Sequence, residues 1–198
     1  MGRYLALEGG DGTGKSTVAA ALVEALESAG QTVIKVREPG GTALGEVVRG
    51  LLLDSESVEP WAEVMLFAAQ RAELAGEVIR PALDRGDWVV SDRTYYSSLA
   101  YQGRARGLGM DTVRTVNEIA LDGTVPDLVL VLDIDPAAGL DRQDDPDRIG
   151  KEGVVFQTEV RAAYHELGER EPDRVVILDA TLPVEELVRS IMARLDVV

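Results

Sequence analysis

A short glycine-rich segment at 9–16, GGDGTGKS, constrains the fold of this chain more than any other feature. It matches the pattern G-x-x-x-x-G-K-[ST], in which glycines allow backbone N–H groups to turn toward phosphate oxygens. An apolar run precedes it at 3–8, and a stretch with helical periodicity begins at Lys15. A chance glycine turn needs neither a strand before it nor a helix after it. The segment therefore predicts a phosphate-binding loop, or P-loop, in an α/β protein.

The predicted loop binds a nucleoside triphosphate with defined side chains. Lys15 brings a positive charge to the β- and γ-phosphates, and the Ser16 hydroxyl is placed to ligate Mg²⁺. The dipole of the following helix adds positive potential at the same point. The residues predicted to bind ATP are Gly9, Gly10, Asp11, Gly12, Thr13, Gly14, Lys15, Ser16 and Thr17.

The rest of the chain alternates between apolar runs and amphipathic helical stretches. The run DLVLVLDI is almost wholly apolar, which is typical of parallel sheets covered on both faces. We therefore predict one α/β domain over 1–198, with a five-stranded parallel sheet and helices on both faces. Strands are predicted at 3–8, 32–36, 88–91, 127–134 and 174–180. Helices are predicted at 15–29, 43–53, 60–85 with a bend or late break at Pro81, 95–102, 111–122, 154–170 and 183–195, and an irregular segment at 136–153.

The composition argues against several classes of function. The chain of 198 residues has no cysteine and one histidine, which disfavours thiolate or histidine-cluster metal sites and Ser-His triads. Its net charge of −15 disfavours a nucleic-acid polymer as partner, because such binders usually carry a basic face. The sequence lacks an apolar stretch of the length that a membrane span or a signal peptide requires. We therefore expect a cytoplasmic protein with small-molecule ligands and no membrane partner.

A P-loop specifies a nucleotide site but not a reaction, so three classes of protein compete. A guanine-specific switch needs an N-K-x-D element, and the single asparagine of the chain, Asn117, is not followed by lysine. A non-catalytic ATP-binding module needs no second ligand site. A kinase needs a site for its acceptor, and the sequence contains a candidate for one.

Three further segments have the composition of a second anion site. These segments are REPGG at 37–41, FAAQR at 67–71 and SDR at 91–93. Arg37 and Arg93 follow predicted strands, and open parallel sheets bind ligands beyond the carboxyl ends of their strands. Phe67 and Arg71 share a helix face, so they can offer a ring to a base and a donor fork to its carbonyl. Taken alone, Phe67 fits an ordinary core aromatic better, and Arg71 fits a solvated helix arginine.

Together these segments resemble the bacterial thymidylate kinases, P-loop enzymes that phosphorylate dTMP to dTDP. EGGDGTGKST resembles the P-loop of the family, REPGGT is a family string, and LFAAQRAEL resembles its base-stacking helix. SDRTYYSSLAYQG is similar to its D-R-x-x-x-S-S-x-A-Y-Q-G segment, and LVLVLDI and VVILDA match its last strands. The resemblance covers nearly the whole chain and implies ATP and Mg²⁺ as cofactors, dTMP as acceptor and a homodimer. A kinase for another nucleoside monophosphate, or for a nucleoside, is the alternative.

The resemblance also implies the residues of the acceptor site. Phe67 would stack on thymine, Arg71 would donate to a thymine carbonyl, and Gln102 would pair with the ring edge. Tyr101 would pack against the sugar C2′ and disfavour a ribonucleotide. The implied dTMP-binding residues are Arg37, Glu38, Pro39, Phe67, Arg71, Arg93, Ser98, Tyr101 and Gln102.

Other positions take more specific roles from the same resemblance. Asp11 would lie near the sugar 3′-hydroxyl or the path of the phosphate, and Glu38 would lie where the two sites meet. Asp92 would hold a Mg²⁺-bound water beside Ser16. The neighbouring Tyr96 and Ser97 are expected to be structural.

The implied catalytic residues are Lys15, Arg93, Arg148, Arg142 and Asp11. Family members without an arginine in the P-loop carry catalytic arginines in a lid, and this P-loop has none. The lid is expected at 139–153, where three basic residues stand against five acidic ones, a net charge of −2. Arg148 matches the family pattern best and Arg142 second; the alternative is a solvated acidic loop. The family usually has an aromatic or similar residue at position 94, where this chain has Thr94.

Overall fold

The computed structural model describes residues 2–142 and 147–197. Within these ranges, five strands form one parallel sheet in the order β2-β3-β1-β4-β5. The strands are β1 (Tyr4–Glu8), β2 (Val33–Arg37), β3 (Trp88–Asp92), β4 (Leu128–Asp133) and β5 (Val175–Asp179). The predicted α/β class with a five-stranded parallel sheet is confirmed.

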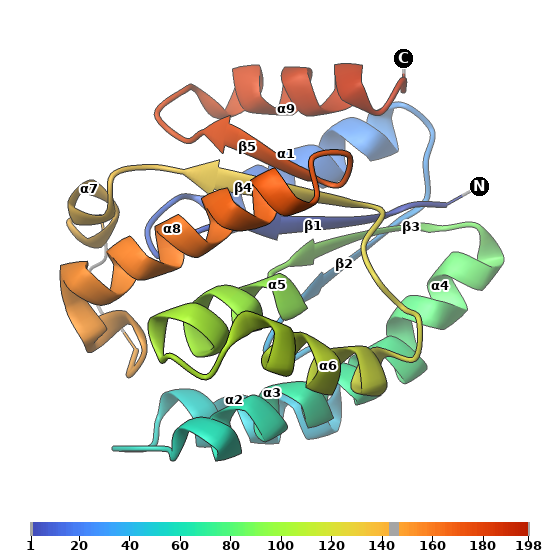
Figure 1. Cartoon of the computed structure of the whole chain (residues 1–198). Helices are drawn as coiled ribbons and strands as arrows, with labels where there is room; N and C mark the ends of the chain where they lie inside the picture. Colours follow the sequence, from blue (N-terminus) through green and yellow to red (C-terminus); the bar gives the residue numbers. More distant parts are fainter. Residues whose placement is uncertain (1, 143–146, 198) are drawn as a thin grey trace.

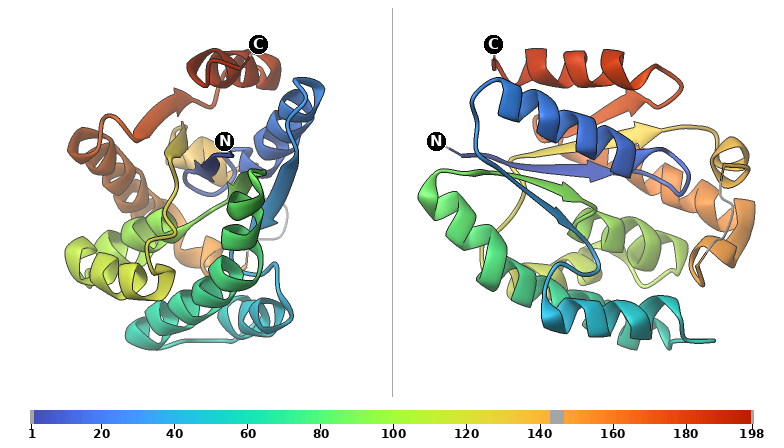
Figure 2. Two further views of the ribbon diagram at one scale, coloured as in Figure 1. Left: turned by 90° about the vertical axis from the view of Figure 1, so that its right-hand side faces the viewer. Right: turned by 180° about the vertical axis from the view of Figure 1, so that it is seen from behind.

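Helices cover both faces of this sheet. The helices, with π- and 3₁₀-segments labelled η, are α1 (Lys15–Ser28), α2 (Ala43–Leu53), α3 (Pro60–Leu74), η1 (Ala75–Ile79), α4 (Arg80–Arg85), α5 (Tyr95–Ser98), η2 (Leu99–Ala105), α6 (Met110–Leu121), α7 (Pro136–Leu140), η3 (Gly150–Glu152), α8 (Gly153–Arg170) and α9 (Val184–Arg194). α1 and α9 pack together on one face, while α3, α5, α6 and α8 lie on the other (Figures 1 and 2). Among the described residues, no helix combines the length and apolar character needed to cross a membrane.

The alternation of side chains along the central strands divides the core into two layers. In β1, Leu5 and Leu7 belong to the cluster formed with α1 and α9, whereas Ala6 belongs to the cluster on the opposite face. In β4, Leu130 and Val129 divide in the same way. Because both faces of these strands are covered, both must be apolar, which explains the run that predicted a parallel sheet.

Two helical predictions differ from the structure. The stretch predicted as one helix over 60–85 is divided by the π-segment η1, so the change in geometry comes before Pro81, which lies in the first turn of α4. The helix predicted at 95–102 also widens into a π-segment, η2, and continues to Ala105. Hydrophobic periodicity does not predict either π-segment, because a π-turn inserts one residue into a helix and leaves its apolar face in place.

The segment predicted to be irregular, 136–153, contains two short helical pieces. Pro136 starts α7, whose N-cap is the Asp135 carboxylate, which accepts from the N–H groups of Ala137 and Ala138. The single turn η3 follows later. Residues 143–146 of the predicted lid lie outside the described residues.

The P-loop packs against α7 through two glycines. Gly12 has a φ of +71°, and a Cβ at this position would lie 1.8 Å from the carbonyl oxygen of Gly139. Gly139 makes the reciprocal approach, since its own Cβ would lie 2.5 Å from the backbone oxygen of Asp11. The loop can therefore reach its position only if both residues lack a side chain.

We predict that Gly12→Ala destabilises the protein more than a glycine substitution in open space. Gly86→Ala is the matched control, because Gly86 also has a positive φ, +87°, but a Cβ there would meet nothing within 4 Å. The control should lose about 1–2 kcal/mol from the left-handed backbone alone. Gly12→Ala should lose roughly 1–3 kcal/mol more from the clash, as measured by denaturant unfolding. Equal losses would show that the P-loop does not depend on this contact.

Candidate active site

One cavity of about 320 Å³ lies at the carboxyl ends of β1, β2 and β3. The nine residues predicted for the acceptor site all line it, together with Lys15, Ser16 and Asp92 from the predicted ATP and Mg²⁺ sites. Among the described residues, the cavity is lined by Asp11, Gly12, Lys15, Ser16, Arg37, Glu38, Pro39, Arg49, Leu53, Phe67, Arg71, Asp92, Arg93, Thr94, Ser97, Ser98, Tyr101, Gln102, Asp147 and Ile149. The P-loop and the three other sequence segments therefore meet in one space.

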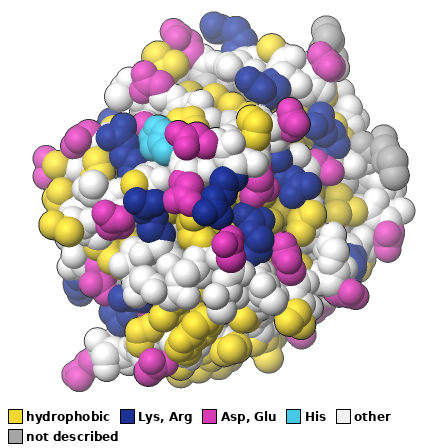
Figure 3. Space-filling view, in the orientation of Figure 1, with side chains coloured by type: hydrophobic (Ala, Val, Ile, Leu, Met, Phe, Trp, Pro, Cys, Tyr) yellow, Lys and Arg dark blue, Asp and Glu magenta, His cyan; other side chains and the backbone are white. Residues whose placement is uncertain are grey.

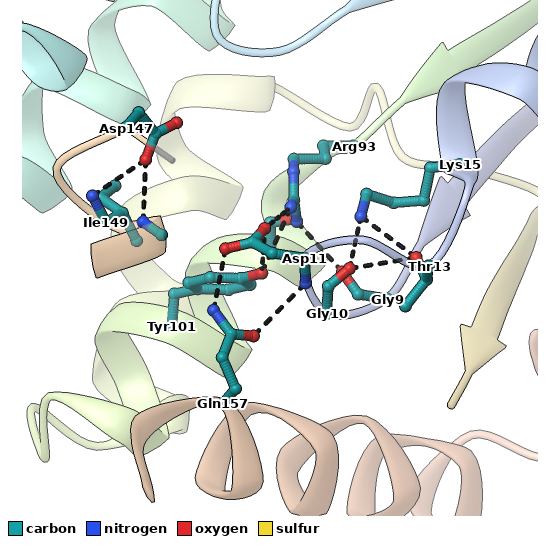
Figure 4. Close-up of polar contacts among 12 residues, drawn as sticks. Gly9, Gly10, Asp11, Thr13, Lys15, Arg93, Tyr101, Asp147, Ile149 and Gln157 are labelled. Atoms are coloured by element: carbon teal, nitrogen blue, oxygen red, sulfur yellow. Dashed lines mark hydrogen bonds and ion pairs between the residues drawn. The ribbon is translucent and has the colours of Figure 1, made fainter. Parts of the chain in front are cut away.

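The P-loop lysine is folded back onto its own loop. Its Nζ donates to the Gly10 carbonyl oxygen at 2.6 Å and to Thr13 Oγ1 at 3.3 Å (Figure 4). Burial, and then the positive charge of Arg93, lower the pKa of Lys15 to about 8. Phosphate oxygens entering the loop would offer this ammonium group stronger acceptors and favour its charged form.

The side chain of the P-loop residue Asp11 contacts Arg93, the residue that directly follows β3. Its Oδ1 accepts from Arg93 Nη2 at 2.5 Å and from the Tyr101 hydroxyl at 2.9 Å, while Oδ2 accepts from Gln157 Nε2 at 2.8 Å (Figure 4). Burial on its own would raise the pKa of Asp11, but the charges of Arg93 and Lys15 outweigh it and the pKa is lowered. An ionised Asp11 is thus the counter-charge that holds Arg93 in the free protein.

Arg93 has an unusual backbone and a fully engaged guanidinium end. Its φ is +71°, in the left-handed region that costs a residue with a Cβ about 1–3 kcal/mol. Besides the contacts with Asp11 and Tyr101, Nη1 donates to the Gly9 carbonyl at 3.2 Å and to Ser97 Oγ at 3.1 Å. A phosphate that binds Nη1 or Nη2 must replace some of these acceptors.

Arg71 is buried, which excludes the alternative of a solvated helix arginine. Its Nε donates to Glu38 Oε2 at 2.5 Å, Nη2 donates to the Thr94 carbonyl at 3.3 Å, and Nη1 contacts Ser98 Oγ at 3.3 Å and Asn117 Oδ1. A guanidinium has five N–H donors, and these contacts occupy four of them. One donor therefore remains for a group inside the cavity.

Glu38 is the buried partner of Arg71. Burial raises the pKa of Glu38, although the charge of Arg71 acts in the opposite direction. Its Oε2 also accepts from Gln70 Nε2 at 3.3 Å, while the buried Oε1 has no hydrogen-bond partner among the described residues. A buried acceptor without a partner favours a site that receives a donor or a water with the ligand.

Phe67 belongs to the hydrophobic core and to the cavity at once. It is 9% exposed, packs within the main core cluster, and its ring lines the cavity 6.0 Å from the Arg71 guanidinium carbon. The core interpretation and the binding interpretation of Phe67 are therefore compatible. Gln102 lines the same space, but its Nε2 already donates to the buried Glu63 carboxylate at 2.7 Å.

The predicted metal ligands are adjacent. Ser16 Oγ donates to Asp92 Oδ2 at 2.5 Å, at the point where the P-loop meets the end of β3. Two hard oxygen groups suit Mg²⁺, which is usually held by few protein groups and completed by waters and phosphates. Elsewhere in the described ranges, no cluster of three or more acidic or histidine side chains could hold a metal alone.

Several lining residues were missed or given a different role by sequence reasoning. Arg49 on α2 donates to the Pro39 carbonyl at 2.8 Å, and burial together with Arg37 lowers its pKa. Ser97, expected to be structural, contacts Arg93 in the cavity.

The sequence does contain a signal for Arg49, because Arg49 follows the REPGG segment by two helical turns. Nothing local indicates Asn117, whose contact with Arg71 depends on how α6 packs.

The structure does not bring the two predicted lid arginines to the P-loop. Arg148 Nη2 pairs with the buried Glu63 at 2.5 Å and Arg148 Nε donates to the Leu52 carbonyl at 3.0 Å, so α2 and α3 hold it on the acceptor side. Arg142 is exposed just beyond α7 and does not line the cavity. No local sequence pattern indicates that Glu63 on α3 is fully buried and pairs with Arg148.

Comparison with known proteins agrees with this geometry. The sequence profile of the thymidylate kinase family matches residues 7–191. A thymidylate kinase of Deinococcus radiodurans is 44% identical, covering 98% of this chain and 96% of that protein, and one of Halothermothrix orenii is 45% identical, covering 96% and 94%. The crystal structure of thymidylate kinase from Ehrlichia chaffeensis superposes with a TM-score of 0.82 at 26% identity, covering 98% of each chain. The chain therefore belongs to the thymidylate kinase family.

Proposed function

We propose that this protein is a dTMP kinase, which transfers the γ-phosphoryl group of ATP to dTMP and releases dTDP and ADP. One observation carries the proposal above all others. The P-loop residue Lys15 lines the same continuous cavity as Phe67 and Arg71, the two residues expected to bind a nucleotide base. A kinase needs this arrangement, because its donor and acceptor phosphates must meet within one site that excludes water.

The acceptor nucleotide has an orientation that these side chains support. The thymine ring stacks on Phe67, and the remaining N–H donor of Arg71 meets a ring carbonyl. Ser98 and Gln102 lie beside the ring, while Tyr101 lies at the sugar and disfavours a 2′-hydroxyl. The residues that line the cavity and carry charge for the acceptor phosphate are Arg37, Arg49 and Arg93.

The transfer step requires positioning and charge compensation rather than a general base. The acceptor phosphate is already an anion, so it can attack the γ-phosphorus directly once the two are aligned. Lys15 neutralises charge on the donor phosphates, and Arg93 bridges toward the acceptor. To make this contact, Arg93 replaces some of its hydrogen bonds to Asp11 with hydrogen bonds to phosphate oxygens. The bonds to Asp11 that remain hold the guanidinium in its orientation.

Mg²⁺ belongs to the proposed reaction as the partner of ATP. Ser16 would ligate it directly and Asp92 would hold one of its waters, so the ion supplies charge neutralisation at the β- and γ-phosphates. The Ser16–Asp92 contact keeps both oxygens at the mouth of the P-loop before the nucleotide binds.

Arg148 and Arg142 are further proposed to stabilise the transferring phosphoryl group from the lid segment 139–153. Arginines in such positions contribute on the order of 10³–10⁵ in kcat in related phosphoryl-transfer sites. For Arg148 this role requires that its pair with Glu63 opens, which distinguishes it from a residue already in place. We expect Arg148→Ala to lower kcat steeply and to leave the binding of dTMP, measured by calorimetry, unchanged.

The function is tested by an acceptor panel with ATP and Mg²⁺, in which products are identified by mass. We expect dTMP to give the highest kcat/KM, with dUMP, UMP, dCMP and thymidine as competitors. Lys15→Ala, purified in the same way, controls for contaminating kinases. It should lose phosphoryl transfer but remain folded, as shown by a cooperative unfolding transition. A different preferred acceptor would replace dTMP in the proposal, and activity in Lys15→Ala would remove the P-loop assignment.

Phe67→Ala should raise the KM for dTMP much more than the KM for ATP. Stacking of a base on an aromatic side chain is worth about 1–3 kcal/mol, which corresponds to roughly 5–150-fold. Phe67→Leu is the control, because it keeps apolar volume in the core but removes the aromatic face. If both variants lose thermal stability and keep the KM for dTMP, Phe67 acts in the core alone.

A homodimer is proposed as the assembly of the chain. Hydrophobic side chains gather on the surface over α2 and α3 (Figure 3), where Leu44, Val47, Leu51 and Met65 are all about half exposed or more. Such a patch favours a protein–protein contact. Sedimentation equilibrium should give a dimer for the native chain and a monomer for Val47→Asp, and a monomeric native chain would contradict the proposal.

A further inference from the structure

Glu8 is a buried carboxylate for which the reaction described above has no role. It is the last residue of β1, directly before the P-loop, and its exposure is 0%. Its Oε1 accepts from the backbone N–H and the hydroxyl of Thr94, both at 2.7 Å. Its Oε2 accepts from Ser97 Oγ at 2.6 Å and from the Tyr164 hydroxyl at 2.7 Å. Four short hydrogen bonds thus satisfy a charge that would otherwise be costly to bury.

These contacts surround Arg93 on both sides. Thr94 is the next residue in the chain, so its two bonds to Glu8 fix the peptide that follows the left-handed Arg93. Ser97 receives an N–H from Arg93 Nη1 at 3.1 Å and donates its own hydroxyl to Glu8. Glu8 is therefore connected to the backbone of Arg93 through one neighbour and to its guanidinium through the other.

Two more contacts complete the turn. The Arg93 N–H donates to the Leu7 carbonyl at 2.9 Å, and Ser91 Oγ donates to the Arg93 carbonyl at 2.6 Å. Both partners come from the central strands β1 and β3, which are rigidly paired. A residue with a Cβ keeps a left-handed backbone only where many surrounding contacts hold it in place. Here Glu8 supplies part of those contacts, through Thr94 and Ser97.

We propose that Glu8 is a positioning residue, which acts through Thr94 and Ser97 to hold Arg93 in the conformation that directs its guanidinium into the cavity. This inference rests on the proposed function, because it takes Arg93 as a ligand of the acceptor phosphate.

A matched pair of substitutions at Thr94 isolates the hydroxyl. Thr94→Val keeps the branched shape and the backbone N–H bond to Glu8 Oε1, but it removes the hydroxyl, which donates to Glu8 Oε1 and accepts from the Tyr96 N–H. Thr94→Ser keeps all three of these contacts. We expect Thr94→Val to lower kcat/KM for dTMP about tenfold or more, because small displacements of a phosphate-positioning group can cost up to about 100-fold. The Kd for ATP should stay within about twofold of wild type, and Thr94→Ser should restore most of the activity.

Glu8→Gln and the double variant Glu8→Gln/Thr94→Val test whether Glu8 and Thr94 position Arg93 through the same contact. If Glu8 acts on Arg93 through Thr94, the double variant should be no worse than the more damaged single variant. Additive losses in kcat/KM would overturn the inference. So would a Thr94→Val protein that melts at a lower temperature and keeps its kcat/KM, because that is the signature of a purely structural role.

Crystal structures of the Thr94 variants separate this inference from the proposed function. In Thr94→Ser, Arg93 should keep its left-handed φ and its contact with Asp11; in Thr94→Val it should lose one or both. An unchanged Arg93 in Thr94→Val overturns the positioning role whatever the enzyme phosphorylates. A displaced Arg93 in a protein whose native form does not phosphorylate dTMP supports the positioning role and refutes the proposed function.

Discussion

The pairing of β1 with β3 is the contact on which the site depends. Leu7 lies opposite Asp92 in the parallel register, so the P-loop that follows β1 and the Arg93 turn that follows β3 leave the sheet side by side. Parallel strands present their carboxyl ends at the same edge, and β2 joins this edge with Arg37 opposite Asp92. Donor and acceptor elements are therefore brought together by the sheet itself.

The same edge concentrates positive charge in a chain whose net charge is −15. Three cations at this edge have an acidic or carbonyl partner: the buried Arg71 has Glu38, the partly buried Arg93 has Asp11, and the buried Lys15 has the Gly10 carbonyl. These partners reduce the cost of burying charge, and they hold the donors in fixed directions. In the proposed reaction, substrate phosphates would replace some of these acceptors of Lys15 and Arg93.

Local sequence was sufficient for the fold class and for residues that belong to continuous strings. The P-loop, Phe67 and Arg71 could be found because spacing within one loop or one helix brings them together. The direction of Arg148 could not, because its pair with the buried Glu63 depends on how the segment after α7 packs against α3. The role inferred for Glu8 was hidden for the same reason: an acidic residue at a strand end gives no local sign that Thr94, Ser97 and Tyr164 will converge on it.

We propose that a thymine nucleotide and ATP occupy one cavity with their phosphates between Lys15 and Arg93. A crystal structure of this chain with dTMP and a non-hydrolysable ATP analogue would show whether the two nucleotides bind in this way. We expect the thymine ring to stack on Phe67, an Arg71 N–H to donate to its carbonyl, and the acceptor phosphate to bind Arg93 in line with the γ-phosphate. A dTMP molecule bound elsewhere, or an acceptor phosphate turned away from the P-loop, would contradict it.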